Sequence, residues 1–244
     1  MGKKSEKRAQ RVAAAQSREF RRVITALTMA APFCLGLRFR DLNRCIEASV
    51  SGAQALARWQ IQARAIPCVA IATHRASGVQ LATGLTRRQH YDRLGLTSSY
   101  EEWEELNASR LPPKGLNTHA IIQASSGHEC AFIDLTAGQL RNPHFPHAMT
   151  VPWQIVRADE RPFESENWIV VYEKPPFDPE VHALISEFSD ITFVDDLHKI
   201  MRFALECDLD ERRFRLGFQR QDPENYNIAM SYITRLGGLD QPIQ

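Results

Sequence analysis

Two residues of this chain, His119 and Asp134, have side chains suited to acid–base chemistry and lie on neighbouring β-prone runs. The runs flank Ser126 and Gly127, a pair that suits a two-residue hairpin turn because the favoured turn types need positive φ. With that turn, His119 and Asp134 stand directly opposite each other, about 5 Å apart at Cβ. A carboxylate at that distance holds one imidazole tautomer and stabilises the protonated ring, as a general acid/base requires.

Cys45 is the best candidate for a nucleophile that such a histidine would serve. If Asn43 caps a helix, Cys45 falls in its first turn, where unpaired backbone N–H groups and the positive helix end favour a thiolate. The same N–H groups could stabilise an oxyanion on an attacked carbonyl. Cys45, His119 and Asp134 would then act as nucleophile, acid/base and orienting carboxylate.

Each of these residues also has a purely structural interpretation. A cysteine near a helix start is often a small buried side chain, and a histidine beside an acid on a hairpin is often a surface pair. Asn43 could donate to an oxyanion or only cap the helix. Gln139 could bond Asp134 or only support the loop that follows it.

Three segments carry a resemblance to a known family: CIEASVSGAQALARWQIQARAIPCVAI (45–71), THAII (118–122) and FIDLTAGQL (132–140). Their order, a cysteine at a helix start, a strand, then histidine and aspartate on successive strands, resembles the transglutaminase-like branch of the papain-like cysteine protease superfamily. The Cys–His–Asp order is also similar to that of arylamine N-acetyltransferases.

The resemblance implies roles for the three residues and a reaction. Cys45 would be the nucleophile, His119 the base and Asp134 the third member of a triad. Members of the family act without a cofactor on amide or ester bonds through a thioester, and pass the acyl group to an amine or to water. The substrate would be a protein, a peptide or a small amide or ester.

The elements that must position these residues predict an α+β fold, and the resemblance implies a papain-like or transglutaminase-like core. In it an antiparallel sheet packs on the cysteine-bearing helix, with additional C-terminal helices. Apolar residues at helical spacing favour a helix from about Cys45 to Trp59, in which Gly52 would permit close packing. The expected strands are 63–72, where Pro67 suggests an edge or a bulge, the two hairpin strands, and 168–173.

Further helices are expected at both ends of the chain. The first continues from Ser17 to Met29 and is ended by Pro32 and Gly36. The later ones begin at Asp178-Pro179, at Asp195 and at Asp222-Pro223, the last ending at Gly237-Gly238.

The domain organisation expected is a basic N-terminal extension (1–22) followed by a single domain (23–244). Its core would be 41–140 and its C-terminal helical part 175–238. The segment 75–116, with a short acidic helix near 98–105, looks like an insertion, either a lid that shapes specificity or a surface loop.

Composition fits a soluble globular protein. The chain has 244 residues, 43% hydrophobic and 24% charged, with a net charge of +1. Its five cysteines form no Cys-x-x-Cys pair, which favours reduced thiols and a cytoplasmic location. A signal peptide is the competing interpretation of the N-terminus, but the apolar run 23–37 is too short to span a bilayer, so we expect a packed helix and no membrane partner.

The remaining clusters of histidine, acidic and basic residues give weaker indications of function. His128-Glu129-Cys130 alternates between strand faces, and His144 and His147 lie in a proline-containing loop, so no metal site is expected. The basic N-terminus is a weak indication of nucleic acid as a partner. The alternative function is therefore a catalytically inactive papain-like fold that binds protein or nucleic acid.

Overall fold

The structure, a computed structural model, describes residues 3–39, 44–76, 78, 80–83, 119–127, 129–136, 153–156, 163–164, 168–173 and 179–235. Several predicted features lie outside these residues: Asn43, Gln139, His128, the short helix near 98–105, and the loop that holds His144 and His147.

The part of the chain that the structure describes contains both helices and strands, which confirms the α+β class. The helices are α1 (Lys3–Arg38), α2 (Cys45–Ala57), α5 (Pro179–Glu187), α6 (Ile191–Glu206), α7 (Glu211–Gln221) and α8 (Pro223–Arg235). The strands are β1 (Gln62–His74), β2 (Gln80–Thr83), β3 (His119–Ser126), β4 (Glu129–Ile133), β5 (Trp153–Val156), β6 (Phe163–Glu164) and β7 (Trp168–Glu173).

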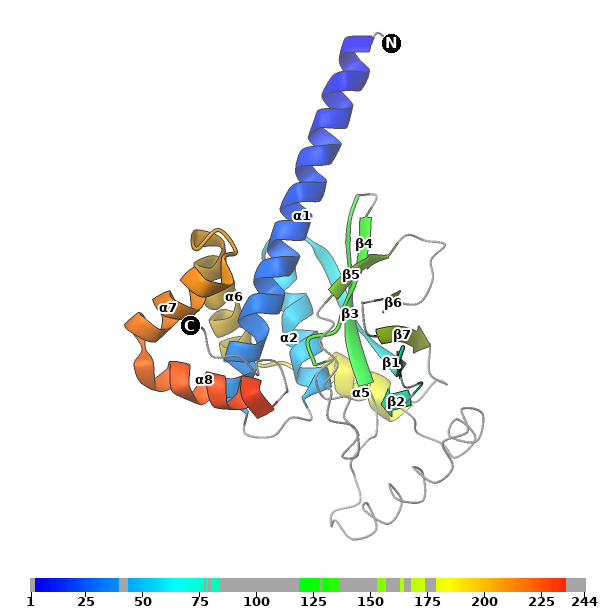
Figure 1. The fold of residues 1–244 in the computed structure, drawn as a ribbon. Helices are drawn as coiled ribbons and strands as arrows, with labels where there is room; N and C mark the ends of the chain where they lie inside the picture. Colours follow the sequence, from blue (N-terminus) through cyan, green and yellow to red (C-terminus); the bar gives the residue numbers. More distant parts are fainter. Residues whose placement is uncertain are drawn as a thin grey trace.

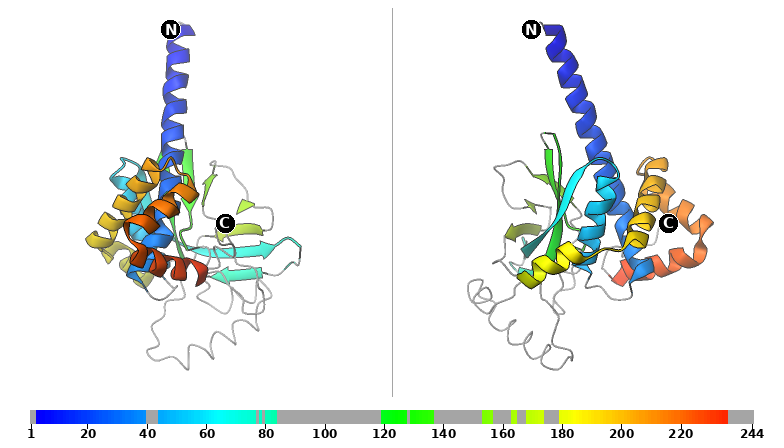
Figure 2. Two further views of the ribbon diagram at one scale, coloured as in Figure 1. Left: turned by 60° about the vertical axis from the view of Figure 1, so that its left-hand side comes forward. Right: turned by 180° about the vertical axis from the view of Figure 1, so that it is seen from behind.

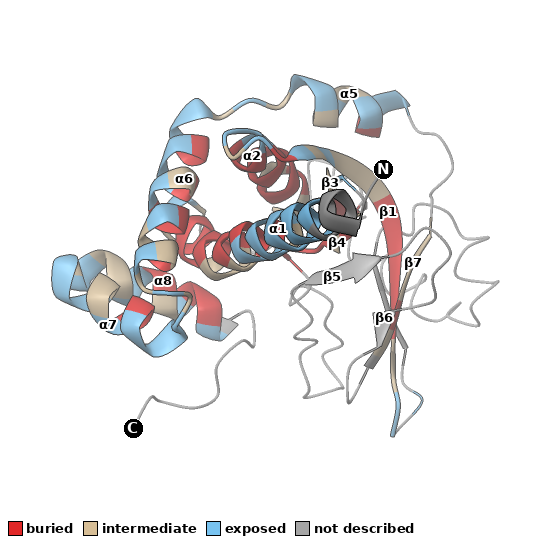
Figure 3. Ribbon diagram, turned by 90° about the horizontal axis from the view of Figure 1, so that it is seen from above, coloured by how far each residue is buried: buried red, intermediate tan, exposed pale blue. Residues whose placement is uncertain are grey.

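The strands form one antiparallel sheet in the order β5-β4-β3-β1-β7-β6, with β2 also paired to β1 (Figure 1). Helix α2 packs on β1 and β3, and α1 lies beside α2. Helices α6 and α8 then cover α1 on the side away from the sheet (Figures 1 and 2). Buried residues line the contact between α1, α2 and α6 (Figure 3), so the main core lies between the helices and one face of the sheet.

Strand β1 connects the two halves of the sheet. Its first half, from Gln62 to Cys68, pairs with β3, and its second half, from Val69 to His74, pairs with β7 and, over part of its length, with β2. Pro67 lies in the half that pairs with β3, opposite Ala120. Because β1 continues past β3 to β7, side chains from the distant β7 reach the end of β3.

The hairpin β3–β4 forms, but its turn differs from the predicted one. Ser126 pairs with Glu129, so Gly127 (φ 61°) is the first turn residue and Ser126 belongs to the strand. Ile122 pairs with Ile133, and the same register places Asp134 beside residue 121 rather than directly opposite His119. The shift is two residues, which keeps both side chains on one face because strand side chains alternate with a period of two.

Helix α1 does not end at Pro32 and Gly36 as predicted, but continues to Arg38 with Pro32 inside it. Burial explains the difference, since Ala31 and Leu35 are in the core and packing outweighs the local helix-breaking tendency. Gly36 serves the packing of α8. A Cβ atom there would lie 2.8 Å from the Cβ of Tyr232 and 3.0 Å from the Cα of Ala229.

The starts of the C-terminal helices agree in part with those predicted from the sequence. Helices α5 and α8 begin at the predicted prolines, Pro179 and Pro223. Helix α6 begins earlier than Asp195, because the Asp190 side chain caps it by accepting from the N–H of Phe193 at 3.0 Å. Helix α7 was not predicted, and the segment expected to be an insertion contributes β2.

Helix α1 is long and apolar enough over Gln10–Arg38 to cross a membrane, by length and composition only. Of its most apolar window, 61% is buried inside the fold, and both a buried core helix and an N-terminal signal sequence meet the same length and composition criterion. The expected boundary after residue 22 falls within this continuous helix.

Candidate active site

Cys45 is the first residue of α2 and is partly buried. The N-cap position is occupied by Arg44, whose side chain makes no capping hydrogen bond, so the predicted cap at Asn43 is wrong by one residue. The Arg44 guanidinium instead lies 2.7 Å from Glu47 and 4.9 Å from the ring centre of Phe39. Cys45 therefore occupies the first turn, as expected.

The face of α2 that carries Cys45 is built from small residues that let the helix approach β3. Ser49, one turn after Cys45, donates a hydrogen bond of 2.8 Å to the buried carbonyl of Ala120. At Gly52, an added Cβ would lie 2.6 Å from Ile122 and 2.9 Å from Leu135. The close packing predicted for Gly52 is confirmed. The Ser49 hydrogen bond holds the first turns of α2 against Ala120, the residue next to His119.

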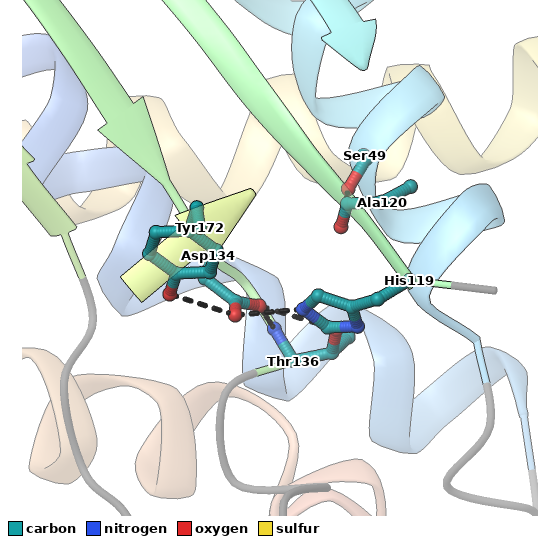
Figure 4. A network of polar contacts seen from close by, with 6 residues as sticks. All are labelled: Ser49, His119, Ala120, Asp134, Thr136 and Tyr172. Carbon is teal, nitrogen blue, oxygen red and sulfur yellow. Dashed lines mark hydrogen bonds and ion pairs between the residues drawn. The ribbon is translucent and has the colours of Figure 1, made fainter. Parts of the chain in front are cut away.

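His119 and Asp134 meet in the interior at the end of the β3–β4 hairpin (Figure 4). The Nε2 atom of His119 lies 2.7 Å from Oδ2 of Asp134, and the side chains are 1% and 2% exposed. Although the register differs from the predicted one, the two residues are close because diagonal neighbours on one face of a sheet remain within reach of long side chains.

Asp134 is held by three further contacts. Its Oδ1 accepts from the backbone N–H of Thr136 at 3.0 Å and from the Thr136 hydroxyl at 3.4 Å. Its Oδ2 also accepts from the Tyr172 hydroxyl at 3.0 Å (Figure 4). Fixed donors on both oxygens orient the carboxylate toward the imidazole, as in a positioned acid/base pair.

The imidazole of His119 interacts with Cys45 as well as with Asp134. Burial lowers the pKa of His119, but the charge and hydrogen bond of Asp134, together with the hydrogen bond and charge of Cys45, raise it from 6.5 to about 10. Because Nε2 is engaged by Asp134, the ring nitrogen left for Cys45 is Nδ1. The charge and hydrogen bond of Asp134 therefore favour the protonated form of the His119 ring.

Two further polar side chains complete the buried cluster. Cys68 faces His119 across the β1–β3 ladder, and burial, with the charges of Asp134 and Cys45, raises the pKa of its thiol well above the ordinary value. Burial and Asp134 likewise raise the pKa of Tyr172, which keeps its hydroxyl protonated as a donor. Cys68 is 3% exposed, so of the two thiols Cys45 is the more accessible.

The structure thus brings together the three residues predicted for the site, whereas Asn43 and Gln139 lie outside the described residues. Sequence reasoning missed Thr136, Tyr172 and Cys68. Thr136 had a local signal, because an aspartate often accepts from the backbone two residues later. Tyr172 had none, because only the register of β1 with β7 brings it to Asp134.

Comparison with known proteins finds no relative: the chain matches no protein family, no curated protein and no solved structure.

Proposed function

We propose that the protein is a cysteine-dependent hydrolase or acyltransferase of transglutaminase-like type, acting on an amide or ester bond through a thioester. The observation that carries the proposal is the imidazole of His119, hydrogen-bonded to Asp134 at 2.7 Å and also interacting with Cys45. Covalent acyl transfer needs a nucleophile, an acid/base and an orienting group within reach of one another.

The first half of the reaction forms the thioester. The Cys45 thiolate attacks the carbonyl carbon, and the resulting oxyanion is stabilised by backbone N–H groups at the start of α2. His119, protonated beside Asp134, gives its proton to the leaving nitrogen or oxygen as the carbonyl carbon releases it. The acyl group is then bound to the sulfur, and the imidazole is neutral.

The second half regenerates the enzyme. Water or an amine attacks the thioester while neutral His119 takes a proton from it, and the thiolate of Cys45 leaves. Water makes the protein a hydrolase, and an amine makes it an acyltransferase. The residues of the triad serve both outcomes. We propose a protein, a peptide or a small amide or ester as the substrate, and no cofactor.

The arrangement of elements supports the finer proposal of a papain-like core. A helix begins at the nucleophile and packs on an antiparallel sheet, in which β3 begins at the histidine and the neighbouring strand β4 ends one residue before the aspartate. A cytoplasmic location is also proposed. None of the five cysteines, all within the described residues, is in a disulfide.

Thiol reactivity tests the proposal. Cys130 and Cys207 are partly buried like Cys45 and are therefore the matched internal controls, whereas Cys34 and Cys68 are buried. We expect iodoacetamide at pH 6 to alkylate Cys45 at least tenfold faster than either control, because only a thiolate reacts and the ordinary thiol is protonated at that pH. His119→Ala should abolish the difference while Cys130 and Cys207 keep their rates.

A second measurement addresses the covalent intermediate. An activated aryl ester should leave its acyl group on the tryptic peptide 45–58, detected by mass spectrometry, and Cys45→Ser should remove the mass shift. Equal alkylation of all three partly buried cysteines, with no acylated peptide, would reject the enzyme and favour the inactive binding module.

A further inference from the structure

The first half of α1 projects away from the body of the protein as a straight helix (Figures 1 and 2). Every side chain from residue 10 to residue 16 is exposed, and burial begins only at Phe20. The projecting helix joins the core firmly at its base, where Ser17 and Arg21 both donate to Glu129, at 2.9 and 2.7 Å.

Arginines on this helix lie on one face, which we call the basic stripe: Arg8, Arg11, Arg18 and Arg22. Their spacing of three, seven and four residues places them within one side of an α-helix, and all four are exposed. Buried Phe20, Ile24 and Leu27 lie on the opposite side. The stripe therefore faces solvent over about 21 Å of helix axis.

The charge of the chain is concentrated here. Residues 1–22 contain eight basic residues and two acidic ones, Glu6 and Glu19. Subtracting these from totals of 30 and 29 leaves 22 basic and 27 acidic residues in the remainder. A near-neutral protein thus carries a strongly positive arm on an otherwise acidic molecule, and such asymmetry attracts a polyanion to the arm.

We propose that the basic stripe binds the phosphate backbone of nucleic acid. Arginines along one face of a rigid, exposed helix can follow successive phosphates, and such contacts are independent of sequence. An anionic membrane fits less well. Interfacial helices need bulky apolar side chains on the other face, whereas the apolar residues between 3 and 17 are four alanines and Val12. The proposal stands apart from the proposed acyl-transfer chemistry.

The test uses the full chain and fluorescence anisotropy with a labelled 30-nucleotide DNA, single- or double-stranded, and with RNA of the same length. The variant is Arg8→Gln/Arg11→Gln/Arg18→Gln. The matched control is Arg202→Gln/Arg212→Gln/Arg220→Gln, which removes the same charge from exposed positions on α6 and α7. Circular dichroism checks that both variants keep the helical content of the parent.

The stripe variant should bind at least roughly tenfold more weakly than the parent. Its negative slope of log affinity against log salt should be shallower by about 2.7 on the duplex, because three counterion-releasing contacts are lost. The control should bind within about twofold of the parent. Equal loss in both variants, an absence of salt dependence, or binding to phosphatidylserine vesicles without binding to any nucleic acid would each overturn the proposal.

Discussion

At the scale of single residues, the site depends on how firmly Asp134 is held. The carboxylate accepts from His119, Tyr172 and Thr136, and it is almost completely buried. A buried charge is tolerated only when its oxygens are hydrogen-bonded. Tyr172 and Thr136 are therefore positioning residues, which act on the proposed chemistry by fixing Asp134 and, through it, the His119 ring.

Tyr172→Phe tests this role. Losing a hydrogen bond to a charged group should lower the free energy of unfolding by about 1.5–3 kcal/mol. It should also slow alkylation of Cys45 severalfold without abolishing it, since the imidazole remains but is held less well. Urea unfolding and the labelling rate are the measurements. Tyr226→Phe is the control, a half-buried tyrosine on α8 whose ring lies 6.3 Å from that of Phe33.

The idea fails if Tyr172→Phe and Tyr226→Phe have the same stability and the same labelling rate. A drop in stability alone would leave Tyr172 a structural residue with no influence on the site.

At the scale of elements, the hairpin and the cysteine-bearing helix could be predicted because their signals are local. The hairpin prediction placed Ser126 wrongly in the turn, but the predicted proximity of His119 and Asp134 was correct. A register shift of two residues leaves each strand residue on the same face of the sheet. Helix ends were predicted less well. Proline and glycine such as Pro32 and Gly36 break isolated helices. In α1, the burial of Ala31 and Leu35 stabilises the helix enough for it to continue past both residues.

Gly36 gives a prediction at this scale. Gly36→Ala should destabilise the protein by about 1–3 kcal/mol, because the new methyl group would meet the backbone of Ala229 and the Cβ of Tyr232, which cannot turn aside. The better helix propensity of alanine recovers only about 1 kcal/mol. Gln16→Ala, at an exposed position of the same helix, should change stability by less than about 0.5 kcal/mol. Thermal unfolding of the two variants measures the difference, and equal stabilities would contradict close packing of α1 on α8.

At the scale of the whole molecule, the site joins segments that are distant in the sequence. Cys45 comes from α2, His119 and Asp134 from the β3–β4 hairpin, and Tyr172 from β7, all brought together by β1. Motif order could predict the first three, because each occurs beside a recognisable local pattern. The contribution of β7 depends on the pairing of strands about 100 residues apart, and single-sequence patterns do not specify which strands pair.

The His119 side chain is only 1% exposed, and its pKa differs between the folded and unfolded protein. Its titration should therefore change the free energy of unfolding of the whole protein. The pKa is 6.5 for an ordinary histidine and about 10 in the folded protein. A raised pKa stabilises the fold fully below about pH 6.5, and the contribution falls as pH rises and is lost above about pH 10. The effect is measured in a Cys45→Ser background, because a Cys45 thiol that gives its proton to the ring on folding would cancel the proton uptake by His119. In that background the free energy of unfolding should fall by roughly 1.4 kcal/mol per pH unit between pH 6.5 and 8.

Urea unfolding of this Cys45→Ser parent across that pH range measures the effect, with two further variants in the same background that remove it in different ways. Asp134→Asn deletes the charge that raises the pKa of His119, and His119→Gln deletes the titrating group, so both should be nearly flat with pH where the parent declines. Changes in other groups are common to all three proteins and cancel in the differences. Profiles that run parallel to that of the parent would mean that His119 is not held protonated by Asp134, and the ring could not then donate a proton to a leaving group at neutral pH.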